Sequence, residues 1–183
     1  MSDKIYDAGV MKDPWSKAVV TITHAHHKLH EGKHYVADYQ DITMSTDDII
    51  AICFTTPDSE ELMHAMMVAS ATGLATVELF ENPTLSAEGT LLSSYNRDRR
   101  SANVSEIVSR HTPTITSPGT LLETWWIGGA GFKSDISGME RGDAGFIFKR
   151  NEQYLVRLTA QADNIRGRIG ADWYEHSEIE WRA

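Results

Sequence analysis

Alternation between apolar and polar side chains is clearest near the carboxyl-terminal end of the chain, over residues 144–160. Two interleaved sets occupy this stretch: Tyr154, Val156 and Leu158 in one, and Leu155, Arg157 and Thr159 in the other. A period of two is typical of a β-strand with one buried face and one more solvent-exposed face. Asn151 and Glu152 form a turn signal before this strand. We therefore expect a β-hairpin whose core-facing residues are Phe146, Phe148, Tyr154, Val156 and Leu158.

The rest of the chain consists of short apolar runs separated by turn residues. Residues 49–55 are continuously apolar, which favours a strand buried on both faces. Further strands are expected at 34–42, 75–80, 107–108, 114–116 and 121–127. About ten short strands with turn signals between them predict an all-β protein, an antiparallel β-sandwich or jelly roll, and not alternating β and α units.

Residues 60–71 carry conflicting signals. Leu62, Met63, Met66 and Met67 form an apolar stripe at helical spacing, so propensity alone favours a helix. Strand-like residues 75–80 come directly after them, within a pattern that is otherwise all β. Because tertiary context overrides propensity, we predict a strand here and keep the helix as the alternative.

The amino-terminal residues 1–28 differ in composition from the rest of the chain. They mix Asp, Lys, Gly and Pro, and Trp15 is the main anchor before a short β-like run at residues 18–23. We expect an extended N-terminal arm over 1–28 and a single sandwich domain over 29–183. A chain of 183 residues is long enough for one domain with a substantial core.

Composition narrows the classes of function. The net charge is −9, with 26 acidic against 17 basic residues, which argues against direct binding to nucleic acid. No secretory signal is recognisable at the N-terminus, and polar residues interrupt the most apolar window, 62–80, so we expect no membrane span. The single cysteine, Cys53, lies in an apolar run and is predicted to be a small buried side chain in a reducing compartment.

Histidines gather between residues 24 and 34. His30, Glu31 and His34 match the H-E-x-x-H pattern of zinc hydrolases, in which both histidines must share one helix face. Gly32 interrupts the motif, and β-patterned residues come after it. We therefore predict a polar linker, with no catalytic residue, metal or cofactor assigned, and His30 and His34 remain the candidate ligands if metal binds.

Two further features point to contact surfaces. Residues 97–100 form a basic run around Asp98, which is expected to be a solvated loop or a salt-bridge loop between subunits. Trp125 and Trp126 are adjacent, so in a strand they face opposite ways. One can lie in the core while the other is free for a partner. The alternative places both in the core, one in each layer.

Several stretches together resemble a family of tailed-bacteriophage virion structural proteins, over roughly residues 29–175. They are residues 29–33, 48–52, 77–81, 95–99, 120–122, 154–159 and 172–175. The Asn-Arg-x-Arg loop at 96–99 and the Tyr-Leu-Val-Arg strand at 154–157 are the most specific parts. The resemblance implies a β-sandwich subunit, often a homotrimer, that binds the major capsid protein on an assembled head.

The resemblance transfers no catalytic residue or cofactor, and it implies a protein made in the host cytoplasm and located on the virion. Our leading hypothesis is a non-enzymatic capsid decoration (cementing) protein. The alternatives are a carbohydrate-binding jelly-roll module, another head–tail or tail component, and, more remotely, a zinc hydrolase. The interface candidates are Trp15, Asn96, Arg97, Arg99, Arg100, Trp125, Trp126 and Arg157.

Overall fold

A computed structural model of the chain describes residues 23–128, 137–140 and 145–177. Within these ranges one short helix, α1 (His24–His30), precedes a series of strands. The strands are β1 (His34–Met44), β2 (Ile49–Thr55), β3 (Glu61–Ala71), β4 (Ala75–Glu81), β5 (Thr84–Ala87), β6 (Thr90–Leu92), β7 (Tyr95–Asn96), β8 (Val108–His111), β9 (Thr114–Ser117), β10 (Thr120–Ile127), β11 (Ser137–Glu140), β12 (Phe146–Ile147), β13 (Gln153–Ala160) and β14 (Ile165–Ser177).

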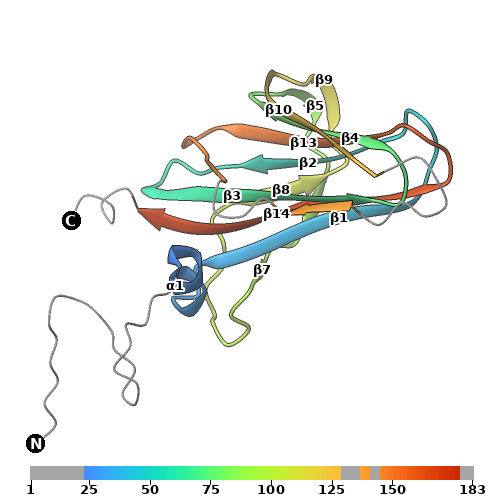
Figure 1. Cartoon of the computed structure of the whole chain (residues 1–183). Coiled ribbons are helices and arrows are strands. Elements are labelled where there is room, and N and C mark those ends of the chain that lie inside the picture. Colours follow the sequence, from blue (N-terminus) through green and yellow to red (C-terminus); the bar gives the residue numbers. More distant parts are fainter. Residues whose placement is uncertain (1–22, 129–136, 141–144, 178–183) are drawn as a thin grey trace, which may run out of the picture.

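Two antiparallel sheets pack face to face. Figure 1 shows the two layers, with β13 and β2 in the upper one and β14 and β1 in the lower one. The first sheet has the order β11-β3-β14-β1-β7, with β12 also paired to β3, and the second has the order β10-β4-β13-β2-β8-β6. The predicted all-β, antiparallel sandwich is therefore confirmed.

The connectivity is that of a jelly roll. Strands β1, β2, β3 and β4 alternate between the two sheets, and so do β10, β11, β13 and β14. The central strands of the sheets consequently run β1-β14-β3-β11 and β2-β13-β4-β10, which is the order that two Greek keys generate. Strands β5 to β9 form an insertion between β4 and β10.

The core lies between the sheets and obeys the period-two pattern. Tyr154, Val156 and Leu158 of β13 point into it, as predicted. Trp173 of β14 meets Phe54 of β2 edge to face, with ring centroids 6.0 Å apart. Burying each side chain of this size contributes about 1.5–3 kcal/mol, so these strands supply much of the stability.

A third layer covers the outer face of the second sheet. The two-stranded sheet β5–β9 places Leu85 and Ile115 on a small apolar cluster there: Ala51, Cys53, Phe80 and Leu155. This cover explains why Leu155 is fully buried although it faces away from the main core. Cys53 is buried as predicted, and burial raises the pKa of its thiol to about 11.

The expected hairpin over residues 144–160 is wrong. β12 pairs with β3 in the first sheet, whereas β13 pairs with β2 and β4 in the second. The turn that the sequence marks is present, with Asn151 at φ 51°, but it carries the chain from one sheet to the other. Alternation identifies which face of a strand is buried, and it does not identify the strand's partner.

Residues Glu61–Ala71 form strand β3, which confirms the prediction of a strand over a helix. β3 pairs with β14 in an unbroken register from Glu61↔Ser177 to Ala71↔Gly167. These ladder hydrogen bonds and the burial of alternate residues outweigh the helical propensity of the methionine-rich stretch.

The predicted polar linker before β1 is also wrong, because α1 forms there. Thr23 caps this helix by accepting a hydrogen bond from the His26 amide at 3.3 Å, and the side chain of Lys28 is buried. The remainder of the predicted arm, residues 1–22, lies outside the described residues. Among the described residues there is no helix long and apolar enough to cross a membrane.

The three-layer packing predicts that Leu155→Ala is strongly destabilising. Truncating a fully buried leucine should lower the free energy of unfolding by about 2–5 kcal/mol, as judged by urea denaturation. Leu91→Ala is the matched control, because Leu91 is 65% exposed on β6 and its loss should change stability by less than about 0.5 kcal/mol. Equal losses of stability in the two variants would contradict the claim that the β5–β9 sheet buries Leu155 on the outer face of the second sheet.

Candidate functional site

Three segments that are distant in sequence meet beside α1. They are the turn 31–33 after the helix, the loop 97–107 after β7, and the end of β14. Asn96 donates its side-chain amide to the Gly32 carbonyl at 2.7 Å, and the Glu175 amide donates to the Lys33 carbonyl at 3.0 Å. Figure 1 shows α1 and the loop after β7 at the lower side of the first sheet. We name this site the polar corner and define it by His34, Asn96, Arg97, Asp172 and Glu175.

Asp172 is the centre of the polar corner. Its side chain lies on the face of β14 opposite the core, yet the residue is only 4% exposed. One carboxylate oxygen accepts a hydrogen bond from His34 Nε2, and the other accepts one from the Arg97 guanidinium. A buried carboxylate is tolerated only when it is paired and hydrogen-bonded, and here both oxygens have donors.

His34 contributes a neutral imidazole to this group. Burial and the nearby Arg97 guanidinium lower the pKa of His34 to about 4. Near neutral pH the ring therefore donates its Nε2–H to Asp172 without carrying charge, and Arg97 is the cation that balances the carboxylate. The Arg97 side chain is 45% exposed, so its pairing with Asp172 ties a partly exposed loop residue to the sheet.

Glu175 holds the far end of the same loop. It accepts hydrogen bonds from the Ser105 hydroxyl at 2.5 Å and from Trp173 Nε1 at 3.2 Å. Burial raises the pKa of this carboxyl group. Two residues beyond Ser105, Ile107 is buried in the core. The loop is consequently fixed at Arg97, at Asn103, whose side-chain amide donates to the Glu31 and Gly32 carbonyls, and at Ser105. Arg99 and Arg100 lie at its exposed tip.

Asn96 has a structural role, in contrast to the interface role that we expected. It is buried, it donates to the carbonyls of Gly32 and Asn103, and its side-chain oxygen accepts from the Asp98 amide at 2.9 Å. Gly32 has φ +68°, and a Cβ there would lie 2.3 Å from Ser101 Oγ. The turn and the loop therefore approach closely because residue 32 has no side chain.

The projecting tip of the loop carries three charges. Arg100 makes two side-chain hydrogen bonds to Asp98, at 2.9 and 3.1 Å, which hold the pKa of Asp98 below its usual range. Asp98 thus has its partner within the chain. One of our two expectations was a loop in which Asp98 takes part in salt bridges between subunits. Arg99 lies over the Tyr95 ring at 5.7 Å. Both arginines are exposed, as a contact role requires.

The other interface candidates separate into three cases. Trp125 lies in the core and Trp126 is 65% exposed, so the first of the two alternatives for this pair is correct. Arg157 is paired to Glu78 at 2.7 Å and lies over the Phe80 ring, so it is satisfied within the chain and not free for a subunit interface. Trp15 lies outside the described residues.

The zinc-hydrolase geometry is absent at the H-E-x-x-H stretch. His30 is the last residue of α1, whereas His34 lies in β1 and binds Asp172. The two imidazoles therefore do not share a helix face, which corrects the remote hydrolase alternative. Within the described ranges no group of three or more His, Cys, Asp or Glu side chains is arranged to hold a metal ion.

The sequence did not reveal the aromatic and histidine cluster beside Asp172. Tyr174 Oη and His64 Nδ1 form a hydrogen bond of 2.5 Å, and the rings of His24 and His176 lie 5.2 and 5.7 Å from that of Tyr174. A signal was present, because Asp172, Tyr174 and His176 alternate along β14. Their partners come from other strands and from α1, so the alternation alone could not identify the cluster.

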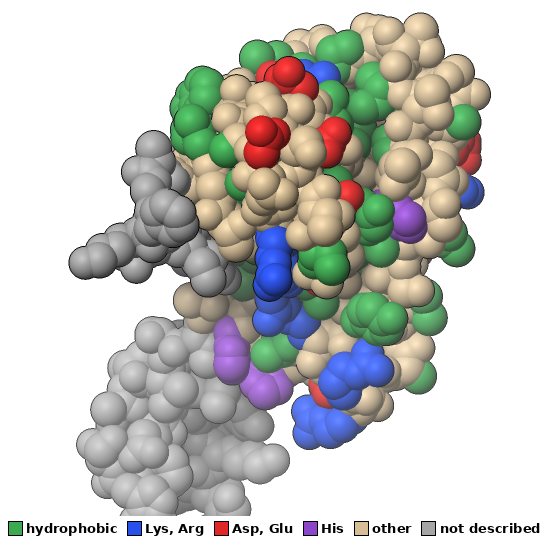
Figure 2. Space-filling model, turned by 90° about the vertical axis from the view of Figure 1, so that its right-hand side faces the viewer, with side chains coloured by type: hydrophobic (Ala, Val, Ile, Leu, Met, Phe, Trp, Pro, Cys, Tyr) green, Lys and Arg blue, Asp and Glu red, His purple; other side chains and the backbone are tan. Residues whose placement is uncertain are grey.

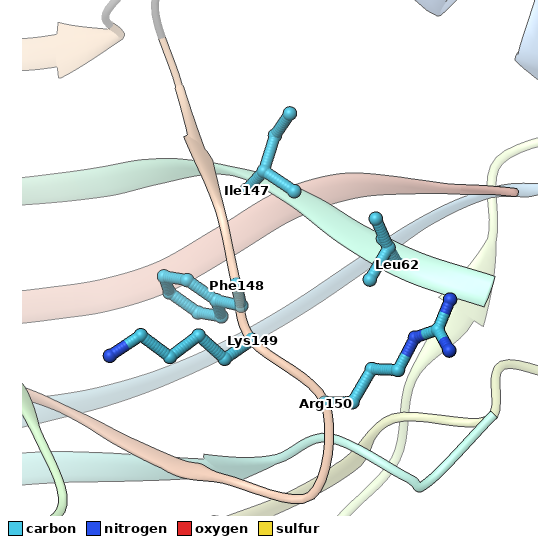
Figure 3. Close-up of a pocket in the computed structure, with 5 residues that line it drawn as sticks. All are labelled: Leu62, Ile147, Phe148, Lys149 and Arg150. Atoms are coloured by element: carbon cyan, nitrogen blue, oxygen red, sulfur yellow. The ribbon is translucent and has the colours of Figure 1, made fainter. Parts of the chain in front are cut away.

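A pocket of about 460 Å³ lies where the chain crosses between the sheets after β12. Figure 3 shows Phe148 and Lys149 on one side of the crossing segment and Leu62, Ile147 and Arg150 on the other. Lys149 is already paired to Glu81 at 2.6 Å. The five lining residues include no carboxylate and no histidine, and their one amine, Lys149, is held by Glu81, so the pocket lacks the paired groups of an acid–base site.

Figure 2 shows one face of the molecule, on which most acidic side chains gather in the upper half and the larger basic groups in the lower half. Hydrophobic side chains form several separate groups across this face. No family model matches the chain, and no curated protein matches its sequence.

The lowered pKa of His34 predicts an acid-sensitive fold. Above pH about 6.5 the ring is neutral in both the folded and the unfolded chain; as the pH falls from there towards 4, only the unfolded chain takes up the proton, so stability falls. Between pH 7 and 5 this titration should lower the free energy of unfolding by about 2 kcal/mol. His34→Gln retains a donor for Asp172 but does not titrate, so urea unfolding should show a smaller loss. Equal losses in both proteins would contradict the assignment.

Proposed function

We propose that this protein is a non-enzymatic structural component of a tailed-bacteriophage virion, and that it decorates and stabilises the assembled head. The sequence resemblance over residues 29–175 supports the phage assignment. Three of its stretches, 29–33, 95–99 and 172–175, supply the segments that meet at the polar corner. The jelly-roll topology supports the structural role, because viral capsid proteins are among the proteins that use it.

The observation that carries this proposal is the anchored loop 97–104. Arg97 is bound to Asp172, Ser105 is bound to Glu175, and Arg99 and Arg100 are exposed between them. A loop that is already ordered loses little conformational entropy when it docks, so more of the contact energy remains for binding. Individually weak contacts of this kind sum over the many copies on a shell.

The partners in this proposal are the major capsid protein and further copies of the same chain. The resemblance favours a homotrimer made in the host cytoplasm and located on the capsid surface. The net charge of −9 favours a protein partner over the phosphate backbone of nucleic acid. The proposal requires no cofactor and no membrane. The same loop could also dock within a neck or tail, and immunogold labelling of virions separates these locations.

A carbohydrate-binding module is the second candidate, and Trp126 is the observation that favours it. This tryptophan is exposed on the outer face of the second sheet and is paired across the ladder with Thr76. An exposed ring on the outer face of a sheet, with the hydroxyl side chain of Thr76 as its cross-strand neighbour, suits stacking on a sugar. Glycan-array binding that disappears in Trp126→Ala and persists after loop substitutions would favour this candidate over capsid decoration.

We expect the purified protein to co-sediment with undecorated capsids and to saturate them. Arg99→Glu combined with Arg100→Glu should weaken this binding by at least about tenfold, because the basic tip is exposed and preorganised for an acidic partner surface. The fraction bound is measured by sedimentation across a range of protein concentrations.

Arg150→Glu combined with Arg166→Glu is the charge-matched control. Both arginines are exposed, and neither makes an ion pair within the described part of the chain. This variant should bind as the parent protein does. Failure of the parent protein to co-sediment at any salt concentration would rule out capsid decoration, and an equal loss in both double variants would rule out the loop as the docking element.

A further inference from the structure

Two histidines on the exposed side of α1 face each other. His26 and His30 are one helical turn apart, and their Nε2 atoms lie 3.0 Å from each other. The rings are nearly perpendicular, with centroids 4.7 Å apart. Residues four apart on a helix lie on the same face, so the backbone of α1 itself brings the two nitrogens together.

The helix that carries this pair is anchored although it has only seven residues. Thr23 caps its first turn, and the buried Lys28 binds Glu31 at 2.7 Å. The turn after the helix is held by the Asn96 amide at the Gly32 carbonyl. The pair therefore sits on a fixed backbone, which keeps the loss of entropy on ligand binding small.

The two Nε2 atoms are joined by a hydrogen bond, and their separation is close to that of two nitrogens bound to one metal ion. Two nitrogens bound to one metal ion at 90° lie about 3.0 Å apart when each bond is about 2.1 Å long, whereas a tetrahedral angle separates them by about 3.4 Å. Square-planar and tetragonal geometries, which have right angles, are typical of Cu²⁺ and Ni²⁺. Zn²⁺ prefers the tetrahedral arrangement.

We propose that His26 and His30 form a bidentate site for a tetragonal divalent transition-metal ion, with Cu²⁺ preferred over Ni²⁺ and Zn²⁺. The metal takes the place of the proton that now joins the two Nε2 atoms. The histidine that donates this proton changes tautomer and carries it on Nδ1, so no net proton is released from two neutral rings. Water completes the coordination, since the site has two protein ligands.

His27 provides an internal contrast for this assignment. It lies on the same short helix and is also exposed, but its Nδ1 faces the Glu31 carboxylate at 3.3 Å. His34, the ligand that the H-E-x-x-H pattern suggested for His30, is buried against Asp172 and is not part of the pair. The site is independent of capsid binding, so either proposal can fail without the other.

The test is titration of the full-length protein with Cu²⁺ alone, monitored by calorimetry and by electron paramagnetic resonance. We expect one ion per chain, a tetragonal spectrum with nitrogen ligands, and Cu²⁺ affinity at least about tenfold above that for Zn²⁺. His26→Ala and His30→Ala should each weaken Cu²⁺ binding by at least about tenfold, and His27→Ala should leave it unchanged. Circular dichroism checks that each variant is folded.

Three results would overturn the proposal. The first is the absence of saturable binding at Cu²⁺ concentrations up to about 1 mM, because a dissociation constant above that value means negligible affinity. The second is a loss in His27→Ala as large as that in His26→Ala, which would indicate diffuse binding by the histidine-rich segment. The third is Zn²⁺ affinity equal to that for Cu²⁺, because a site of two imidazoles should follow the Irving–Williams order, in which Cu²⁺ binds more tightly than Zn²⁺.

Discussion

The buried carboxylate of Asp172 is the constraint on which the polar corner depends. An isolated charge in this position would cost several kcal/mol, so β14 can keep Asp172 there only if donors are supplied. His34 supplies one from the neighbouring strand and Arg97 supplies the other from the loop after β7. Folding of the sheet and docking of the loop are therefore linked at this carboxylate, which holds the start of the loop, while Asn96 and Glu175 hold its later part.

The jelly roll provides the frame for this arrangement. Its two sheets bury an apolar core, and each sheet carries added structure on its outer face: α1 and the loop on the first, and β5–β9 on the second. The insertion between β4 and β10 supplies both the cover over Leu155 and the loop that reaches Asp172. Stability and the candidate docking surface thus come from the same inserted segment, which is consistent with a protein whose role is to present a rigid surface.

The sequence predicts the local structure well and the long-range contacts poorly. Alternation correctly placed Tyr154, Val156 and Leu158 in the core and separated Trp125 from Trp126. The all-β pattern of the neighbouring segments, and not alternation, led to the correct prediction of a strand over residues 60–71. Alternation missed the partners of Asp172, which lie 75 and 138 residues away in sequence. A period of two indicates on which face of a strand a side chain lies, but not which residues of other strands it contacts. The sequence pattern missed α1 for a different reason: a short helix is stabilised by its cap and by packing on β14, and neither is visible in propensity.

The central claim is that Asp172 fixes the loop, and amide hydrogen exchange measured on the parent protein and on Asp172→Asn tests it most directly. Asparagine has nearly the same shape but no charge to hold Arg97. The account predicts that amides of residues 97–104 exchange at least about tenfold faster in the variant, while the amides of β13, which are hydrogen-bonded in the ladders with β2 and β4, keep their protection. Unchanged protection of the loop would contradict the account, and so would uniform loss of protection throughout the sandwich.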